Sequence, residues 1–271
     1  MRFINRHPGE GGRWLLSLLP LVLLLLVYGV ASSLRLAENA DDKLLPSAAQ
    51  MVDAVKQMAF TEDERTGEIL LWSDTAASLK RLFMGIGIAA VAGLCLGIAA
   101  GSFATLGATL SPLLAVLSMV PPLAILPILF IVFGLDELSK VMLIVIGIAP
   151  VLSRDLEHRA REIPVEVLVK AQTLGANSWT VVLRVVLPQL LSRLFVALRL
   201  MLGAAWLFLI SAEAISATSG LGYRIFLVRR YMSMDIILPY VAWITLLAWA
   251  MDHALKVLNR RCFPWSEGAV R

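Results

Sequence analysis

Two ionisable side chains, Arg199 and Glu213, interrupt one long apolar segment of the sequence, Leu194–Tyr223. A charged group inside an apolar helix of this length is costly, and it usually faces a partner or a water-filled cavity. At about 1.5 Å per residue, a helix that enters a membrane near Phe195 carries Glu213 about 27 Å along its axis. Glu213 is therefore expected near one membrane surface, and Arg199 about one turn inside the other.

These two positions leave several roles open. Glu213 either hydrogen-bonds neighbouring helices and stabilises that end of the bundle, or supports a gate. Direct binding of an anion by Glu213 is disfavoured because like charges repel. Arg199 either snorkels to the surface, pairs with an acidic residue, or attracts an anion at the exit of a pathway.

The pair Pro121-Pro122 stands deep inside another apolar run and removes helix hydrogen bonds there. Broken backbone is tolerated at membrane depth only where protein or a cavity surrounds it. The pair therefore predicts either a kink used for packing or the start of a half-helix. In the second case the free amide groups would face a pathway and favour an anion.

Other chemistry is missing from the sequence. No Gly-x4-Gly-Lys-Ser/Thr pattern for ATP binding is present, and His7, His158 and His253 are scattered. Neither Cys95 nor Cys262 has the spacing of a metal site or a disulfide. We find no cluster of Asp, His, Ser or Glu that would equip an intramembrane enzyme. The sequence therefore predicts no catalytic residues, no metal and no cofactor in this chain.

The composition of the chain indicates what kind of structure must position these residues. Of the 271 residues, 59% are hydrophobic and only 16% are charged, which places the chain in the membrane class. The formal net charge is +4. In a soluble protein that charge would suggest nucleic acid, but here the basic residues gather at the ends of apolar runs. They therefore indicate membrane orientation, and we expect a lipid bilayer rather than nucleic acid as the surrounding partner.

The apolar runs predict an all-α integral membrane protein with six transmembrane helices. A run of about 20 residues is enough to cross a hydrocarbon core. The first run follows a basic N-terminus like a signal peptide, but it is longer than a usual signal segment, which favours a retained helix. The expected spans are Trp14–Leu34, Leu82–Ala100, Leu106–Phe133, Leu138–Ser153, Leu194–Tyr223 and Asp235–His253.

Charge asymmetry predicts the orientation of these spans. The segment from 37 to 74 is acid-rich and is expected outside, with a surface helix over Ala48–Met58, whereas the segment from 154 to 193 is basic and is expected in the cytoplasm. Both termini are then cytoplasmic. The predicted division is an N-terminus (1–13), a first helix (14–35), a periplasmic loop (36–77), a core (78–258) and a tail (259–271). Five basic residues fit poorly because they fall on the outer side, namely Lys80, Arg81, Arg224, Arg229 and Arg230.

The cytoplasmic segment contains a second pattern, from Val169 to Pro188. Gly175 can adopt a left-handed conformation and end one helix, and Asn177 or Ser178 can cap the next. Pro188 marks the approach to the following span. Trp179, Val182, Leu183 and Val186 then recur at near-helical spacing along the second helix. Such an amphipathic helix either lies on lipid or docks in a groove of a partner.

This segment resembles the cytoplasmic EAA loop of ATP-binding cassette (ABC) importer permeases. The matching positions are Ala171, Gly175, Val185, Leu187 and Pro188. Val169 stands where the loop usually has Glu, and Lys170 replaces its first Ala, so the acidic contact is either absent or displaced to Glu166. The resemblance implies that an ATPase contacts this segment. The coupling residues that it implies are Ala171, Gly175, Ala176, Ser178, Trp179, Val185, Leu187 and Pro188.

The resemblance extends over about residues 40 to 260 and points to the nitrate/sulfonate/taurine branch of these permeases. The similar segments are 41–47, 78–85, 120–140, 197–213 and 219–223. It implies a type I importer in the bacterial inner membrane. Two permease copies would form the pathway, two cytoplasmic ATPases would hold ATP and Mg, and a periplasmic binding protein would deliver a small anion. The alternative is a stand-alone channel or secondary transporter, in which 175–188 forms a membrane-surface helix.

Overall fold

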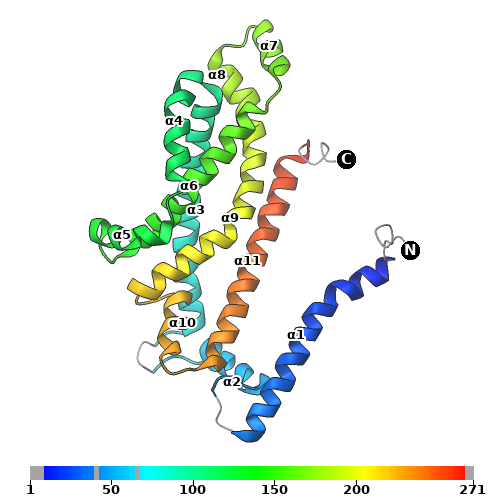
Figure 1. The fold of residues 1–271 in the computed structure, drawn as a ribbon, viewed down its shortest axis with the longest axis vertical. Coiled ribbons are helices and arrows are strands. Elements are labelled where there is room, and N and C mark those ends of the chain that lie inside the picture. The colour runs from blue at the N-terminus through cyan, green and yellow to red at the C-terminus, as the bar shows by residue number, and fades with distance from the viewer. Residues whose placement is uncertain (1–8, 40–42, 65–66, 266–271) are drawn as a thin grey trace.

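The computed structural model of the chain describes residues 9–39, 43–64 and 67–265. Within these ranges every regular element is a helix (Figure 1). The elements are α1 (Glu10–Glu38), α2 (Ala48–Phe60), α3 (Leu70–Ser102), α4 (Ala104–Leu117), a 3-10 turn (Pro122–Ile125), α5 (Leu126–Phe133), α6 (Glu137–Arg161), α7 (Val165–Thr173), α8 (Ser178–Val181), a π-helical segment (Val182–Val186), α9 (Leu187–Ser216), α10 (Leu221–Arg229) and α11 (Met234–Cys262). The expected N-terminal charges Arg2 and Arg6 lie outside the described residues.

Within the described part of the chain, four helical stretches are long and apolar enough to cross a membrane: Leu15–Glu38, Leu70–Ser102, Ser178–Ser216 and Met234–Cys262. A fifth crossing results if α4 and the Pro122–Phe133 pair, which meet at a bend of 81°, count as one broken span. By length and composition the structure thus gives four or five spans where the sequence predicts six. The remaining predicted span corresponds to α6, whose ends carry many charged residues.

The centre of the bundle is the close packing of α3 against α6. Small residues recur along one face of α3 and let the two backbones approach. A Cβ atom added at Gly97 would lie 2.6 Å from the Cβ atom of Leu156, closer than real contacts allow. The same holds along the whole contact, where Gly85, Gly93, Gly97 and Gly101 face Ile144, Leu152, Leu156 and Ala160. Small residues at a helix interface are the usual means of tight packing in membranes.

The other helices pack around this pair. α9 lies against α6 and α3, and α11 lies against α9. In Figure 1, α7 and α8 stand at one end of the bundle, and α2 and α10 stand at the opposite end. A helix, α2, is present where the sequence predicts a surface helix over Ala48–Met58, and its start is fixed by a capping box between Ser47 and Gln50.

Helix α1 is splayed away from the bundle (Figure 1). It is tied at its C-terminal part, where the Tyr28 hydroxyl donates to the Pro46 carbonyl at 2.8 Å and the Ser32 hydroxyl donates to the Leu45 carbonyl at 3.0 Å. Its leucine and valine side chains are otherwise exposed, for example Leu24 at 66%. A helix that is apolar on all sides suits a lipid environment.

Several expected boundaries differ in the structure, and three of them bear on the site. Helix α3 already begins at Leu70, so Asp74 lies in a buried helix and not in a polar loop. The helix expected to continue to Tyr223 ends at Ser216, and α10 begins after a break at Leu221. The short amphipathic helix expected before Pro188 is not separate, because helix runs unbroken from Ser178 to Ser216. In that stretch Pro188 directly follows the π-helical segment Val182–Val186 and stands at the start of α9.

Candidate functional site

Glu213 is completely buried near the C-terminal end of α9 and is surrounded by donors. Its carboxylate accepts hydrogen bonds from Arg81 Nη1 at 2.7 Å, from the Ser78 hydroxyl at 2.8 Å, and from the Gly222 amide at 2.9 Å. A buried carboxylate with this many hydrogen-bond partners is held in one position. The predicted hydrogen bonds to a neighbouring helix are present, since Ser78 and Arg81 belong to α3.

Arg81 on α3 connects Glu213 to a second carboxylate. Its Nη2 donates to Glu137 Oε1 at 2.7 Å and its Nε to Glu137 Oε2 at 2.5 Å, while Nη1 also donates to the Ser219 carbonyl at 2.7 Å. The Arg81 side chain is 4% exposed, whereas that of Glu137 is 64% exposed. The Arg81 guanidinium holds the pKa of the Glu137 carboxyl below its usual range. Arg81 therefore joins α3, α6 and α9 at one point.

Asp74, also on α3, completes this cluster. Its carboxylate accepts from the Gly220 amide at 2.9 Å and from Arg224 Nε at 2.8 Å, and Tyr240 on α11 approaches at 3.5 Å. Gly220 has φ of +125°, and a side chain there would collide with the Glu213 carboxylate. We call these residues the Arg81 cluster: Asp74, Ser78, Arg81, Glu137, Glu213 and Arg224.

The sequence pointed to only one member of the Arg81 cluster, Glu213. Arg81 and Arg224 were signalled indirectly, as basic residues on the side of the membrane that should carry few. Their buried carboxylate partners explain that misfit, because each cation is neutralised inside the protein. Asp74 was missed because it ends the acid-rich segment 37–74, which the sequence predicts to be a loop outside the membrane.

Arg199 lies away from this cluster and pairs with an acidic residue. Its Nε and Nη2 donate to the two carboxylate oxygens of Asp252 on α11 at 2.7 and 2.8 Å. The two side chains are 29% and 40% exposed. Of the three roles left open for Arg199, the pairing role is the one that the structure contains.

The Pro121-Pro122 pair lies at a break in the chain. Helix α4 ends at Leu117, Pro122 opens a 3-10 turn, and α5 follows at a bend of 81°. The pair therefore marks both a bend of the chain and the start of a short helical segment, so the packing kink and the half-helix at a pathway stay predictions. Arg154 on α6 supports the turn, because its Nη1 donates to the Ser118 hydroxyl at 2.8 Å.

The segment that resembles the EAA loop has the predicted turn. Gly175 adopts φ of +86° after α7, and its amide donates to the Gln172 carbonyl at 2.9 Å. The Asn177 side chain then accepts from the Thr180 amide at 2.8 Å. The left-handed Gly175 is thus confirmed, and of the two candidate caps it is Asn177, not Ser178, that begins the next helix.

The implied coupling residues divide between surface and core. Gly175, Ser178 and Trp179 are exposed, with Trp179 at 67%. The half-buried members, which lie toward the bundle, are Ala171, Ala176, Val185, Leu187 and Pro188. Leu174 and Leu183 are exposed as well, at 80% and 56%. The turn therefore presents a row of apolar side chains, Leu174, Trp179 and Leu183, which we call the exposed row.

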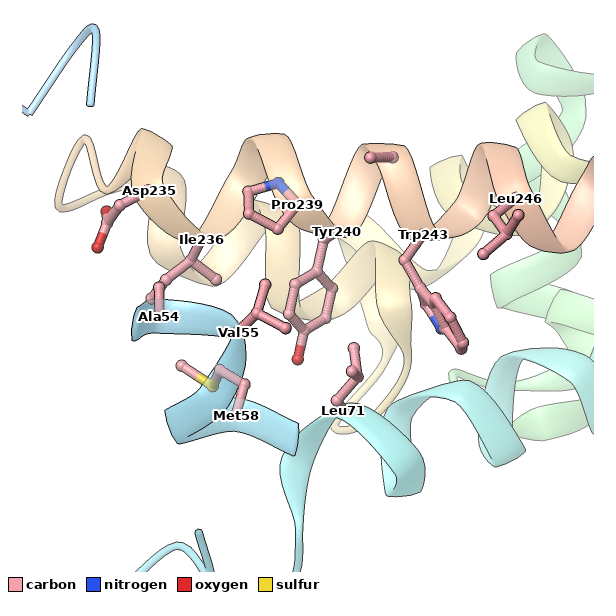
Figure 2. A pocket seen from close by; sticks show the side chains of 11 residues that line it. Ala54, Val55, Met58, Leu71, Asp235, Ile236, Pro239, Tyr240, Trp243 and Leu246 are labelled. Carbon is pink, nitrogen blue, oxygen red and sulfur yellow. The ribbon is translucent and has the colours of Figure 1, made fainter. Parts of the chain in front are cut away.

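An apolar groove of about 290 Å³ lies where α2 meets the start of α3 and α11. Figure 2 shows the side chains that line it, among them Val55, Met58, Leu71, Tyr240 and Trp243. Asp235 is the charged residue of the lining. The groove suits hydrocarbon and offers little to a small charged solute.

Long apolar helices, a buried ion cluster and a broken helix together are typical of an integral membrane protein of the helical class. Residues 93–265 match the family described as binding-protein-dependent transport system inner membrane component, and the chain belongs to this family.

Several curated relatives are similar over most of the chain. The taurine transport system permease protein TauC of Escherichia coli (strain K12) is 32% identical over 92% of this chain and 89% of its own length. The putative aliphatic sulfonates transport permease protein SsuC of the same strain is 30% identical over 94% of each. The bicarbonate transport system permease protein CmpB of Synechococcus elongatus is 34% identical over 74% of this chain and 77% of its own.

A solved structure shares the fold. A chain of the MetNI methionine ABC transporter in an inward-facing conformation superposes with a TM-score of 0.62 at 19% identity, over 71% of this chain and 97% of that one. The chain is therefore the permease subunit of an ABC importer, located in the inner membrane, and a transport subunit rather than an enzyme. Family membership sets aside the alternative of a stand-alone channel or secondary transporter, and it implies ATPase and binding-protein partners.

Proposed function

We propose that two copies of this chain form the pathway of an importer for a small anion, with six spans in each copy. The sixth span lies within α6, over Leu138–Ser153, and α6 as a whole has 25 residues and would cover about 37 Å at 1.5 Å per residue. Its charged ends have partners, since Lys140 pairs with Glu137 and Glu157 pairs with Arg161. Both termini and the α7–α8 segment lie in the cytoplasm, and α2 and α10 lie on the periplasmic side.

The observation that carries the coupling role is the exposed row at the α7–α8 turn. An apolar row fixed by a left-handed glycine and an Asn cap is a rigid surface suited to a groove on a partner. Trp179 also contacts Phe103, at the α3–α4 corner, with ring centroids 6.4 Å apart. A push on this surface would therefore reach the helix pair at the centre of the bundle. The partner is a cytoplasmic ATPase, which holds ATP and Mg.

The relatives favour an anionic substrate. Their names refer to taurine, aliphatic sulfonates and bicarbonate. Taurine and the sulfonates carry a sulfonate group, and bicarbonate is itself a monoanion with a planar oxygen pair. We infer that this chain transports a small molecule with one such oxyanion, delivered by a periplasmic binding protein.

Copurification tests the coupling role. Trp179→Asp replaces an exposed aromatic with a charge that desolvates poorly in an apolar groove. We expect this variant to insert and fold but to lose most of its bound ATPase. Phe60→Asp is the matched control, because Phe60 is even more exposed, at 77%, and lies at the opposite end of the bundle. Normal ATPase recovery with Trp179→Asp would show that the exposed row lies on lipid instead.

A further inference from the structure

Glu137 occupies an unusual place in the Arg81 cluster. It is largely exposed, yet its carboxylate lies between two cations that are both buried, Arg81 at 4% and Lys140 at 3%. Lys140 Nζ lies 3.5 Å from Glu137 Oε1. Arg81 presents Nε and Nη2 in the two-pronged geometry that matches any planar pair of anionic oxygens.

The charges in this region balance only when Glu137 is counted. Glu213 is paired with Arg81, and Asp74 is paired with Arg224, so both deeply buried carboxylates are neutralised. Lys140 has Glu137 as its carboxylate partner. If the Glu137 side chain turned outward, the site would keep one net positive charge and a set of donors. One monoanion would restore neutrality.

We propose that Arg81, Lys140 and the Ser219 hydroxyl form a binding site for a monoanionic oxyanion, and that the Glu137 carboxylate fills this site in the structure until such an anion displaces it. The chemical class includes sulfonates, carboxylates and bicarbonate. This inference deepens the proposed function and rests on it, because it places the substrate's charged group within the permease.

Displacement is possible without unpacking the helices. Arg81 keeps its bonds to the buried Glu213 and to the Ser219 carbonyl when Glu137 leaves. Glu137 stands in the first turn of α6 and is already 64% exposed, so its side chain can turn into water. The Ser219 hydroxyl lies 3.4 Å from Arg81 Nη2 and can turn toward an incoming oxygen.

A tethered carboxylate competes with a free anion as an internal ligand of about millimolar effective concentration. The parent chain should therefore bind a free sulfonate weakly. Removing the tethered competitor should tighten binding by about tenfold or more, because Lys140 is then left without its carboxylate partner and the site carries one net positive charge.

The test uses the full purified chain with its ATPase and measures the binding of ethanesulfonate by calorimetry and by thermal stabilisation. We expect Glu137→Gln and Glu137→Ala to bind at least about tenfold more tightly than the parent. Adding Lys140→Met to either variant should abolish the gain. Lys80→Met is the matched control, since Lys80 precedes Arg81 on α3 but is exposed, and it should bind as the parent does. Diethyl sulfone, a neutral probe, should give no stabilisation.

Equal binding by the parent and both Glu137 variants would overturn the proposal, as would a gain that survives Lys140→Met. If Glu137→Ala does not assemble, Glu137→Gln decides by the same criterion. ATPase recovery is recorded in the same preparations. The α7–α8 turn lies at the opposite end of the bundle (Figure 1), so failure of this site would leave ATPase recovery normal, whereas failure of the coupling role would not.

Discussion

Arg199 on α9 and Asp252 on α11 form a two-point ion pair, in which both oxygens of the carboxylate accept from the guanidinium at 2.7 and 2.8 Å. The residues are 53 positions apart in the sequence, so the pair ties two helices that the chain connects only through α10. The charge of Arg199, which lies in an apolar run of the sequence, is therefore balanced by Asp252 of the same chain.

If the role of Arg199 is to pair with Asp252, replacing either residue should have the same effect. We expect Arg199→Gln and Asp252→Asn each to lower stability by about 1 kcal/mol, and the double variant to be no worse than either. Thermal unfolding of the purified chain measures this. Reduced transport in Arg199→Gln alone, with Asp252→Asn unaffected, would instead assign Arg199 to the anion pathway.

Glu213 should tolerate the loss of its charge better than the loss of its polarity. Glu213→Gln keeps an acceptor for Ser78 and Gly222, and we expect it to assemble with a loss of about 1–3 kcal/mol. Glu213→Leu leaves these donors and Arg81 without their buried acceptor and should cost about 3–5 kcal/mol. Complex yield and unfolding temperature are the readouts. A Glu213→Gln variant with full stability but greatly weakened substrate affinity would make Glu213 a ligand.

The close approach of α3 and α6 should be sensitive to a single methyl group. Gly97→Ala places a Cβ atom 2.6 Å from Leu156, so the helices must separate, and we expect a loss of about 1–3 kcal/mol. Gly87→Ala is the matched control on the same helix, because nothing lies within 4 Å of its added Cβ. The unfolding temperature of Gly87→Ala should equal or exceed that of the parent. Equal stability of both variants would contradict the packing described for α3.

The turn at Gly175 should depend on backbone conformation alone, since nothing lies within 4 Å of an added Cβ there. With φ of +86°, Gly175→Ala should weaken ATPase binding or stability by about 1–2 kcal/mol, and Gly175→Asn by less, because Asn tolerates this region. Gly203→Ala in the middle of α9 is the control and should be neutral. Proline at position 175 cannot adopt a positive φ and should abolish coupling.

Low pH should weaken the ion pair between Glu137 and Arg81 in the Arg81 cluster. The pKa of Glu137 is lowered in the folded chain, mainly by its hydrogen bonds to Arg81. Such a group contributes stability that is complete well above the unfolded pKa of about 4.3 and is lost as the pH falls through the lower folded value. The difference in unfolding temperature between the parent and Glu137→Gln should therefore be constant near neutral pH, shrink as the pH falls below about 4.3, and vanish only below the lowered folded pKa. Arg81 on α3 and Lys140 on α6 are the cations that face Glu137. A difference that persists unchanged into acid would contradict the pairing.

Composition and apolar runs predicted the helical class, and the Gly175 turn followed from local conformational preference. These features depend on short-range physics, which a sequence displays directly. The partners of Glu213 could not be predicted, because Arg81 lies 132 positions away and the contact depends on how α3 and α9 cross. Charge counting also failed at Arg224, since a rule about solvent-facing loops does not cover a cation buried against Asp74. The end of α9 was placed too late because the apolar run continues through a turn that Gly220 makes possible.

The face of α3 that carries Gly85, Gly93, Gly97 and Gly101, here called its glycine face, also matters during synthesis of the chain. α3 is complete at residue 102, but the helix that fills its glycine face ends at Arg161. At about 5–20 residues per second, roughly 3–12 s separate the two during synthesis. In that interval α3 must remain in the insertion machinery or the bilayer without α6 packed against its glycine face. A chain that ends before α6 is therefore expected to be degraded by membrane proteases. If α6 supplied as a separate fragment protected that chain, the packing of α6 against α3 would be the folding step that stabilises it.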